Sequence, residues 1–142
     1  MVALKMHPSQ SVNLVLRFWR EVWSPPYNID AIDELLTEDF SAVNAGVPIQ
    51  SRAAFKEWVS MFGSRIGDIR LEPQDTFANV DGTKVASRWH ATGRNNGMFG
   101  LQPNGEPVAF TGISIWEVRG GKLVSHWFER SALELFQKLT AS

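Results

Sequence analysis

Cysteine is absent from this chain of 142 residues. Without a thiol the protein can form no disulfide and can carry out no thiolate chemistry. Because the chain has neither disulfides nor thiols, we expect the protein in the reducing cytoplasm. A chain of this length can bury a substantial core, and its size predicts a single domain over residues 1–142.

The sequence also lacks an excess of either charge and any long apolar run. The formal net charge is -1, with lysine and arginine scattered along the chain. We therefore expect neither nucleic acid nor a membrane as a partner. The three histidines are far apart in the sequence, so no metal site is predicted; they are His7, His90 and His126.

Aromatic residues are abundant, with six tryptophans and nine phenylalanines. Large rings either fill a core or line a cavity for an apolar ligand, and composition does not decide between the two. Eight of them are candidates for lining a pocket, although rings at helical or strand spacing also suit an ordinary core: Trp19, Trp23, Trp58, Phe62, Trp89, Phe99, Trp116 and Trp127.

The first half of the chain has helical periodicity. Apolar residues recur at helical spacing in residues 10–23, 28–36 and 51–66, and Ser51 is placed to cap the third of these helices. Two prolines end the first helix, because proline cannot continue the hydrogen-bond ladder. A short strand is expected within residues 39–49.

The second half alternates with the period of β-strands. Asp81-Gly82 is a candidate type I′ turn, and the hairpin around it sets Asp75 opposite Arg88. Residues 93–106 are either a lid over a pocket or a surface connection. A further strand, a hairpin over residues 112–130 and a helix over 131–139 follow. The pattern predicts an α+β domain in which helices pack on one face of a curved, mostly antiparallel sheet and enclose a cone-shaped pocket.

The hairpin over residues 112–130 turns at Gly120-Gly121, a strong two-residue turn signal. A regular register from that turn sets Ser114 opposite Trp127, and it puts His126 on the other face. With no histidine on its face, Ser114 is not expected to be a nucleophile. One face then carries five side chains: Ser114, Trp116, Ser125, Trp127 and Glu129.

Residues 89–139 carry a recognisable series of motifs. A tryptophan is followed by spaced glycines, a strand, a "GKLV" turn, the pair "HW" and a short leucine-containing terminal helix. In the N-terminal half, "IDAIDELLTEDF" is a short helix that ends in an acidic pair and phenylalanine. In these features nearly the whole chain resembles the SnoaL-like polyketide cyclase family.

The resemblance implies the nuclear-transport-factor-2-like, or cystatin-like, α+β cone, usually a homodimer. Its relatives include isomerases and lyases: ketosteroid isomerases and scytalone dehydratases. It also implies catalysis without metal or organic cofactor, in which a pocket carboxylate removes a proton α to a carbonyl and pocket donors stabilise the enolate. The ligand would be a hydrophobic, polyketide-like carbonyl compound.

The chain departs from the family at the usual acidic positions. Ser114 and Ser131 stand where relatives often have a carboxylate or histidine, and Asn95 replaces a common loop histidine. Asn44 follows the short strand, where relatives place a polar or acidic pocket residue.

Three residues are candidates for a catalytic role, each with a simpler alternative. Glu129 is either the general base or a solvated residue at the rim of the sheet. Ser114 is either a pocket hydroxyl or a small residue beneath two tryptophans, and Asn44 either orients a ligand or satisfies its own turn. Two functions are therefore compatible with the sequence: a cofactor-free cyclase or isomerase, and a non-catalytic ligand-binding or dimerisation domain of the same fold.

Overall fold

In the computed structural model, which describes residues 7–141, four α-helices and a short 3-10 helix accompany six strands. The helices are α1 (Pro8–Val22), α2 (Ala31–Leu35), α3 (Arg52–Ser64), η1 (Met98–Gly100) and α4 (Ala132–Thr140). The strands are β1 (Leu36–Asn44), β2 (Val47–Ile49), β3 (Ile66–Ala78), β4 (Lys84–Asn95), β5 (Pro107–Arg119) and β6 (Lys122–Arg130).

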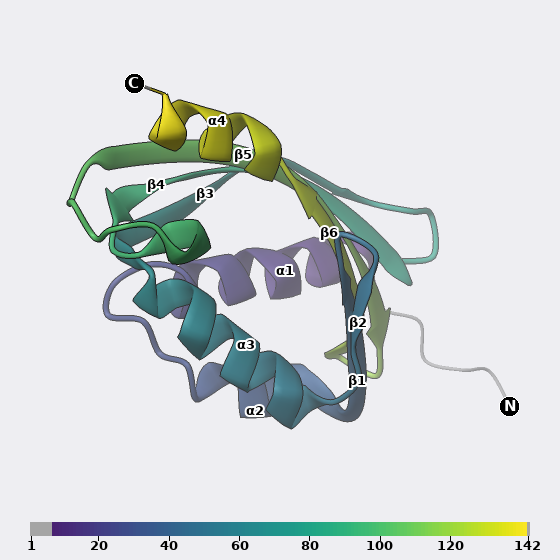
Figure 1. Cartoon of the computed structure of the whole chain (residues 1–142). Helices are drawn as coiled ribbons and strands as arrows, with labels where there is room; N and C mark the ends of the chain where they lie inside the picture. The colour runs from purple at the N-terminus through teal and green to yellow at the C-terminus, as the bar shows by residue number, and fades with distance from the viewer. Residues whose placement is uncertain (1–6, 142) are drawn as a thin grey trace, which may run out of the picture.

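The strands form one curved sheet in the order β2-β1-β6-β5-β4-β3. Neighbouring strands are antiparallel except β1 and β6, which run parallel. Helices α1, α2 and α3 lie on the concave side of the sheet, whereas α4 lies across β5 on the opposite side (Figure 1). The predicted α+β architecture is confirmed, with the three N-terminal helices on one face of a mostly antiparallel sheet and α4 on the other.

Local sequence explains where the main helices begin. His7 caps α1, since its side chain accepts a hydrogen bond from the Ser9 N–H and Gln10 completes the capping box. Ser51 caps α3 as predicted, accepting from the Ala54 N–H at 2.9 Å. Each helix then turns an apolar stripe toward the sheet.

The β3–β4 hairpin has the expected register but a different turn. Asp75 pairs with Arg88, as predicted. Of the turn residues, only Gly82 has a positive φ, so the turn is not type I′, which needs positive φ at both central residues. The Asn79 side chain instead bridges the turn to Thr83 and to the Lys84 N–H.

The β5–β6 hairpin corrects the predicted register. Gly120 and Gly121 both have positive φ, as a type I′ turn requires. At Val124, β6 contains a β-bulge, after which Trp116 pairs with His126 and Ser114 pairs with Phe128. A bulge adds one residue to one strand, so every later side chain of β6 moves to the opposite face. The prediction that Ser125, Trp127 and Glu129 share the inner face with Ser114 is wrong for this reason.

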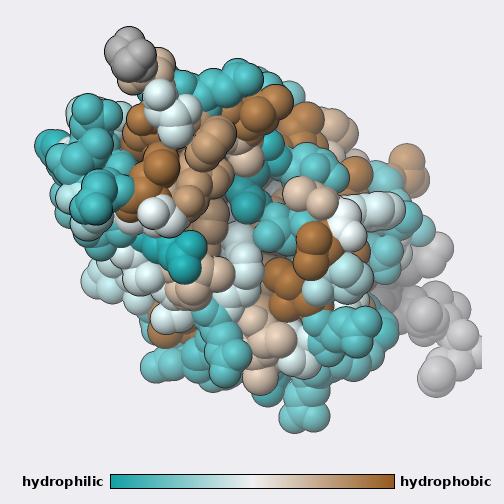
Figure 2. Space-filling model, in the orientation of Figure 1, coloured by the Kyte–Doolittle hydropathy of each residue, from teal (hydrophilic) through white to brown (hydrophobic). Residues whose placement is uncertain are grey.

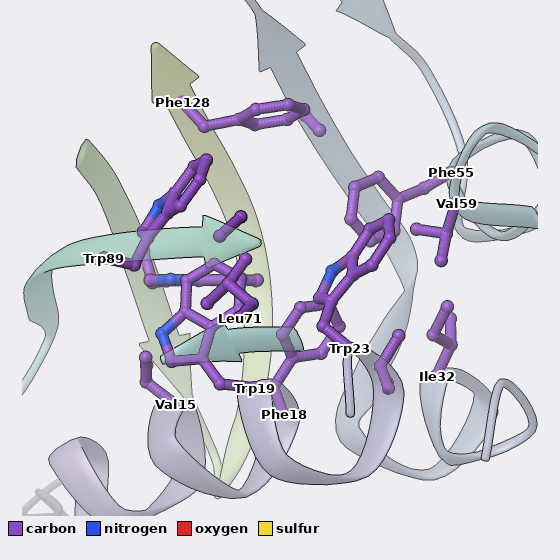
Figure 3. Packing of buried hydrophobic residues seen from close by; sticks show 14 of the residues in the cluster. Val15, Phe18, Trp19, Trp23, Ile32, Phe55, Val59, Leu71, Trp89 and Phe128 are labelled. Atoms are coloured by element: carbon purple, nitrogen blue, oxygen red, sulfur yellow. The ribbon is translucent and has the colours of Figure 1, made fainter. Parts of the chain in front are cut away.

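The core between α1, α3 and the sheet is dominated by rings. Figure 3 shows Phe18, Trp19 and Trp23 projecting from α1 toward Trp89 and Phe128 of the sheet. Ring pairs meet mostly edge-on or tilted, the arrangement that aromatic quadrupoles favour. The Trp89 ring packs directly against the backbone of Gly112. A Cβ at that position would lie 2.2 Å from the ring, so the contact requires glycine.

The connection over residues 93–106 is organised by Asn95, which is fully buried. Its side chain accepts from the N–H groups of Gly97 and Met98 and donates to Gln102 and to the side chain of Asn104. Figure 2 shows apolar residues gathered over α4 on this side of the molecule. There the ring of Phe99 packs edge-on against Phe136, at 5.4 Å between centroids.

Candidate functional site

The inner face of β6 carries His126, Phe128 and Arg130, all placed there by the bulge. They help to enclose a cavity of about 30 Å³ between α1, α3 and the sheet, which is room for about two water molecules. The cavity is lined by Trp19, Trp23, Phe55, Trp58, Phe62, Ile69, Leu71, Trp89, Phe110, His126, Phe128 and Arg130. Arginine and histidine are thus the polar side chains of an otherwise apolar and aromatic chamber.

Ser114 lies fully buried beside this cavity and links two rings. Its hydroxyl accepts a hydrogen bond from Trp89 Nε1 at 3.0 Å and lies 2.8 Å from His126 Nε2. The sequence-based statement that no histidine shares its face is wrong, since the bulge brings His126 there. Within residues 7–141, Nδ1 of His126 has no hydrogen-bond partner.

His126 is held between two aromatic faces. Its ring stacks on Trp116 with 3.6 Å between centroids and lies 4.4 Å from the Phe128 ring. Burial of the imidazole disfavours the charged form and lowers the pKa of His126 well below its ordinary value. The ring is therefore neutral at pH 7, with one nitrogen that can accept a proton.

Arg130 is a largely buried cation that forms no salt bridge with a described residue. Its guanidinium lies 4.9 Å from the Phe62 ring centroid and within 6 Å of Trp58 and Phe128, close enough for cation–π attraction. Arg130 Nη1 donates to the Asn44 amide oxygen at 2.6 Å. Burial lowers its pKa, although the charge of the neighbouring Glu129 acts to raise it. An arginine remains charged under such conditions, so its other donors are available to a ligand.

The structure brings only part of the predicted site together. Asn44 and Ser114 each contact a polar residue of the cavity, Arg130 and His126 respectively. Glu129 lies exposed on the outer face of β6, away from the cavity. The Asp39 carboxylate is also outside, where Thr37 and Arg119 lower its pKa.

The predicted aromatic residues divide in the same way. Those that line the cavity are Trp19, Trp23, Trp58, Phe62 and Trp89. Trp116 is buried behind His126, Phe99 packs on α4, and Trp127 is 59% exposed on the outer face. Because the bulge reverses β6, Trp127 cannot reach the cavity.

Sequence reasoning missed His126 and Arg130, and no local signal identified them. Both possible inner faces of residues 125–130 mix aromatic with polar residues, so alternation alone does not choose between them. The bulge at Val124 involves no glycine that would have marked it.

The α+β fold, a sheet curved around helices, is similar to the ketosteroid-isomerase-like fold. A protein of that fold from Catenulispora acidiphila, solved with trimethylamine, is 16% identical, with a TM-score of 0.66 over 82% of this chain and 83% of its own. A proposed SnoaL-like polyketide cyclase from Jannaschia sp. CCS1 is 16% identical, with a TM-score of 0.85, and covers 100% of this chain and 99% of its own. IdmH from Streptomyces antibioticus, described as a proposed polyketide cyclase, is 20% identical with a TM-score of 0.80 and covers 93% and 99%.

The sequence profile of the SnoaL-like polyketide cyclase family matches residues 13–139. The chain therefore belongs to this family, and the predicted fold is confirmed. No curated protein matches the sequence. Over residues 7–141 no helix is long and apolar enough to cross a membrane, and no three acidic or histidine side chains are clustered so that they could hold a metal ion.

Proposed function

We propose that this protein is a cofactor-independent cyclase or isomerase that acts on a hydrophobic, polyketide-like carbonyl compound. The observation that carries the proposal is the Arg130 guanidinium, which faces an aromatic cavity and forms no salt bridge within residues 7–141. A carbonyl oxygen bound there would gain a charge-assisted hydrogen bond when it becomes an enolate. Asn44 holds the guanidinium in place.

In the proposed reaction, His126 takes the part that the family gives to a carboxylate. Its neutral ring accepts the proton of the carbon next to the carbonyl, and the electrons of that C–H bond form the enolate, whose oxygen lies at Arg130. The enolate carbon then either attacks a second carbonyl of the same molecule, which closes a ring and leaves an alkoxide that takes the proton from His126, or takes that proton back at another carbon. Ser114 holds the histidine ring in place through Nε2.

The proposal predicts enzyme-catalysed exchange of activated protons. In D₂O, wild-type protein should accelerate deuterium incorporation at the central carbon of pentane-2,4-dione and of 1-phenyldecane-1,3-dione, measured by NMR. Glu129→Gln should exchange at the wild-type rate, because this carboxylate lies on the outer face. Loss of exchange in Glu129→Gln would indicate that Glu129 is the general base, and it would refute the mechanism in the cavity.

The non-catalytic alternative is favoured by one observation. Within the described part of the chain, no carboxylate lines the cavity. A ligand-binding domain would still bind both diketones, measured by calorimetry, but would not raise their exchange above the buffer rate. The same two measurements therefore separate the two functions.

We also propose that the protein is a homodimer, as the family resemblance implies. Ile113, Ile115 and Trp127 lie on adjacent strands of the outer face and are 53%, 45% and 59% exposed. Such a patch is typical of an association surface. Trp127→Glu should convert the dimer to a monomer in analytical ultracentrifugation, whereas Val80→Glu, at an exposed hairpin tip, should not. A wild-type monomer would refute this proposal.

A further inference from the structure

The cavity at Arg130 is too small for the ligand that the proposed function requires. Its volume is about 30 Å³, whereas sites for drug-sized molecules span roughly 300–1,000 Å³. A second, outer pocket of about 310 Å³ opens to the surface between the end of α1, α3 and the start of β3. The two volumes are neighbours, because Trp23 and Ile69 line both of them.

Trp23 is the larger part of the wall between the cavity and the outer pocket. In Figure 3 its indole projects from the end of α1 and lies between Trp19 and the side chains of Phe55 and Val59. Its ring meets the rings of Trp58 and Phe62 edge-on, at 6.4 and 6.0 Å between centroids. Removing this one ring from its position would join the two volumes.

Trp23 is also less firmly held than the neighbouring tryptophans of the cavity. Trp19 and Trp89 each donate an indole N–H to a buried serine hydroxyl at 3.0 Å, which fixes both rings. The Trp23 indole has no hydrogen-bond partner within residues 7–141, whereas its backbone is fixed by hydrogen bonds to the Trp19 carbonyl and from the Leu71 N–H. A rotation of this ring therefore breaks ring contacts but no side-chain hydrogen bond.

The walls of the outer pocket suit an uncharged apolar group. They include the aliphatic side chains of Val22, Ile29, Val59, Ile66 and Ile69. The Tyr27 hydroxyl donates to the Ile69 carbonyl at 2.7 Å, so it is already engaged. Asp68 lies at the pocket, but its carboxylate is 87% exposed to solvent and pairs with Arg94 at 3.8 Å, so it contributes little charge to the pocket.

We propose that the outer pocket is the second half of the ligand site, and that an elongated ligand displaces Trp23 to occupy both halves. The carbonyl end lies at Arg130, and an uncharged alkyl or aryl tail lies between α1, α3 and β3. This inference rests on the proposed function for the position of the carbonyl end. It adds the requirement that the preferred ligand has a long apolar tail.

Filling the outer pocket tests the inference. Ser60 is an exposed residue of α3 that lines this pocket, and Ser60→Phe places a ring inside it. Ser64→Phe is the matched control, because Ser64 is on the same helix and does not line the pocket. Dissociation constants for pentane-2,4-dione and 1-phenyldecane-1,3-dione are measured by calorimetry for each variant and for the wild type.

We expect Ser60→Phe to weaken binding of the long diketone by about tenfold or more and to change binding of the short one by less than about twofold. Ser64→Phe should bind both as the wild type does. Equal effects of Ser60→Phe on the two probes, or no effect on the long one, would overturn the inference. Wild-type protein that binds the long diketone no better than the short one would overturn it as well.

Replacing Trp23, which separates the cavity from the outer pocket, is an independent test of the inference. Trp23→Ala should speed association of the long diketone by about tenfold, as measured by stopped-flow absorbance of its enol. Val80→Ala, at an exposed hairpin tip that lines neither volume, should leave the rate unchanged. An unchanged or slower rate in Trp23→Ala would show that Trp23 does not control entry. The binding and association measurements test the two-part ligand site, whereas proton exchange tests the proposed function. If neither diketone exchanges protons, the proposed function fails, whatever the effect of Ser60→Phe on binding.

Discussion

Replacing Arg130 with methionine is expected to lower diketone proton exchange by about 100-fold or more. Loss of one well-placed donor to a developing oxyanion typically costs a factor of this size in rate. Methionine has a similar length and keeps the contacts with the Trp58 and Phe62 rings, but it supplies neither charge nor hydrogen bond. The measurement is the NMR exchange rate of both diketones in D₂O.

The stability of the same variant separates a role in ligand binding from a structural role. Replacing a buried charge by an apolar side chain of similar volume is often neutral or stabilising. Arg130→Met should therefore unfold at the same urea concentration as the wild type, or at a higher one. Arg130→Lys retains the charge without the planar pair of donors, and we expect an intermediate rate. Wild-type exchange in Arg130→Met would remove the arginine from the mechanism.

The second large effect is a loss of stability in mild acid caused by His126. Burial lowers its pKa in the folded protein, whereas in the unfolded chain the imidazole titrates near its ordinary value of about 6.5. Below that pH the unfolded chain binds a proton that the folded protein does not. Stability is therefore complete above about pH 6.5 and decreases as the pH falls, by up to about 1.6 kcal/mol between pH 6.5 and 5.0.

Urea unfolding at a series of pH values measures this effect. His126→Gln should be less stable at pH 8, because it loses the stacking on Trp116, but its stability should depend much less on pH between 6.5 and 5.0. His90→Gln, on the outward side of β4, is the matched control and should keep the acid-dependent loss. An acid-dependent loss of unchanged size in His126→Gln would show that another group causes it.

Local patterns predicted most of the elements. The helical spacing around Phe18 and Phe55, the Ser51 cap and the paired glycines at 120 and 121 act over a few residues, so they can be recognised in the sequence. The β3–β4 register was predicted for the same reason, even though its turn has another geometry. The prediction of which β6 side chains face inward failed, because the extra residue at the bulge exchanges the two faces of the strand.

The sequence by itself determined the α+β class, the longer helices, the β3–β4 and β5–β6 hairpins and the family, because each follows from short-range periodicity or from spaced motifs. Only the tertiary structure decided which side chains of β6 face the cavity. The bulge exchanges Trp127 and Glu129 for His126, Phe128 and Arg130, and a bulge is stabilised by packing across strands rather than by a residue type. The cavity and the outer pocket on either side of Trp23 likewise depend on how α1, α3 and the sheet pack together, which no single segment encodes.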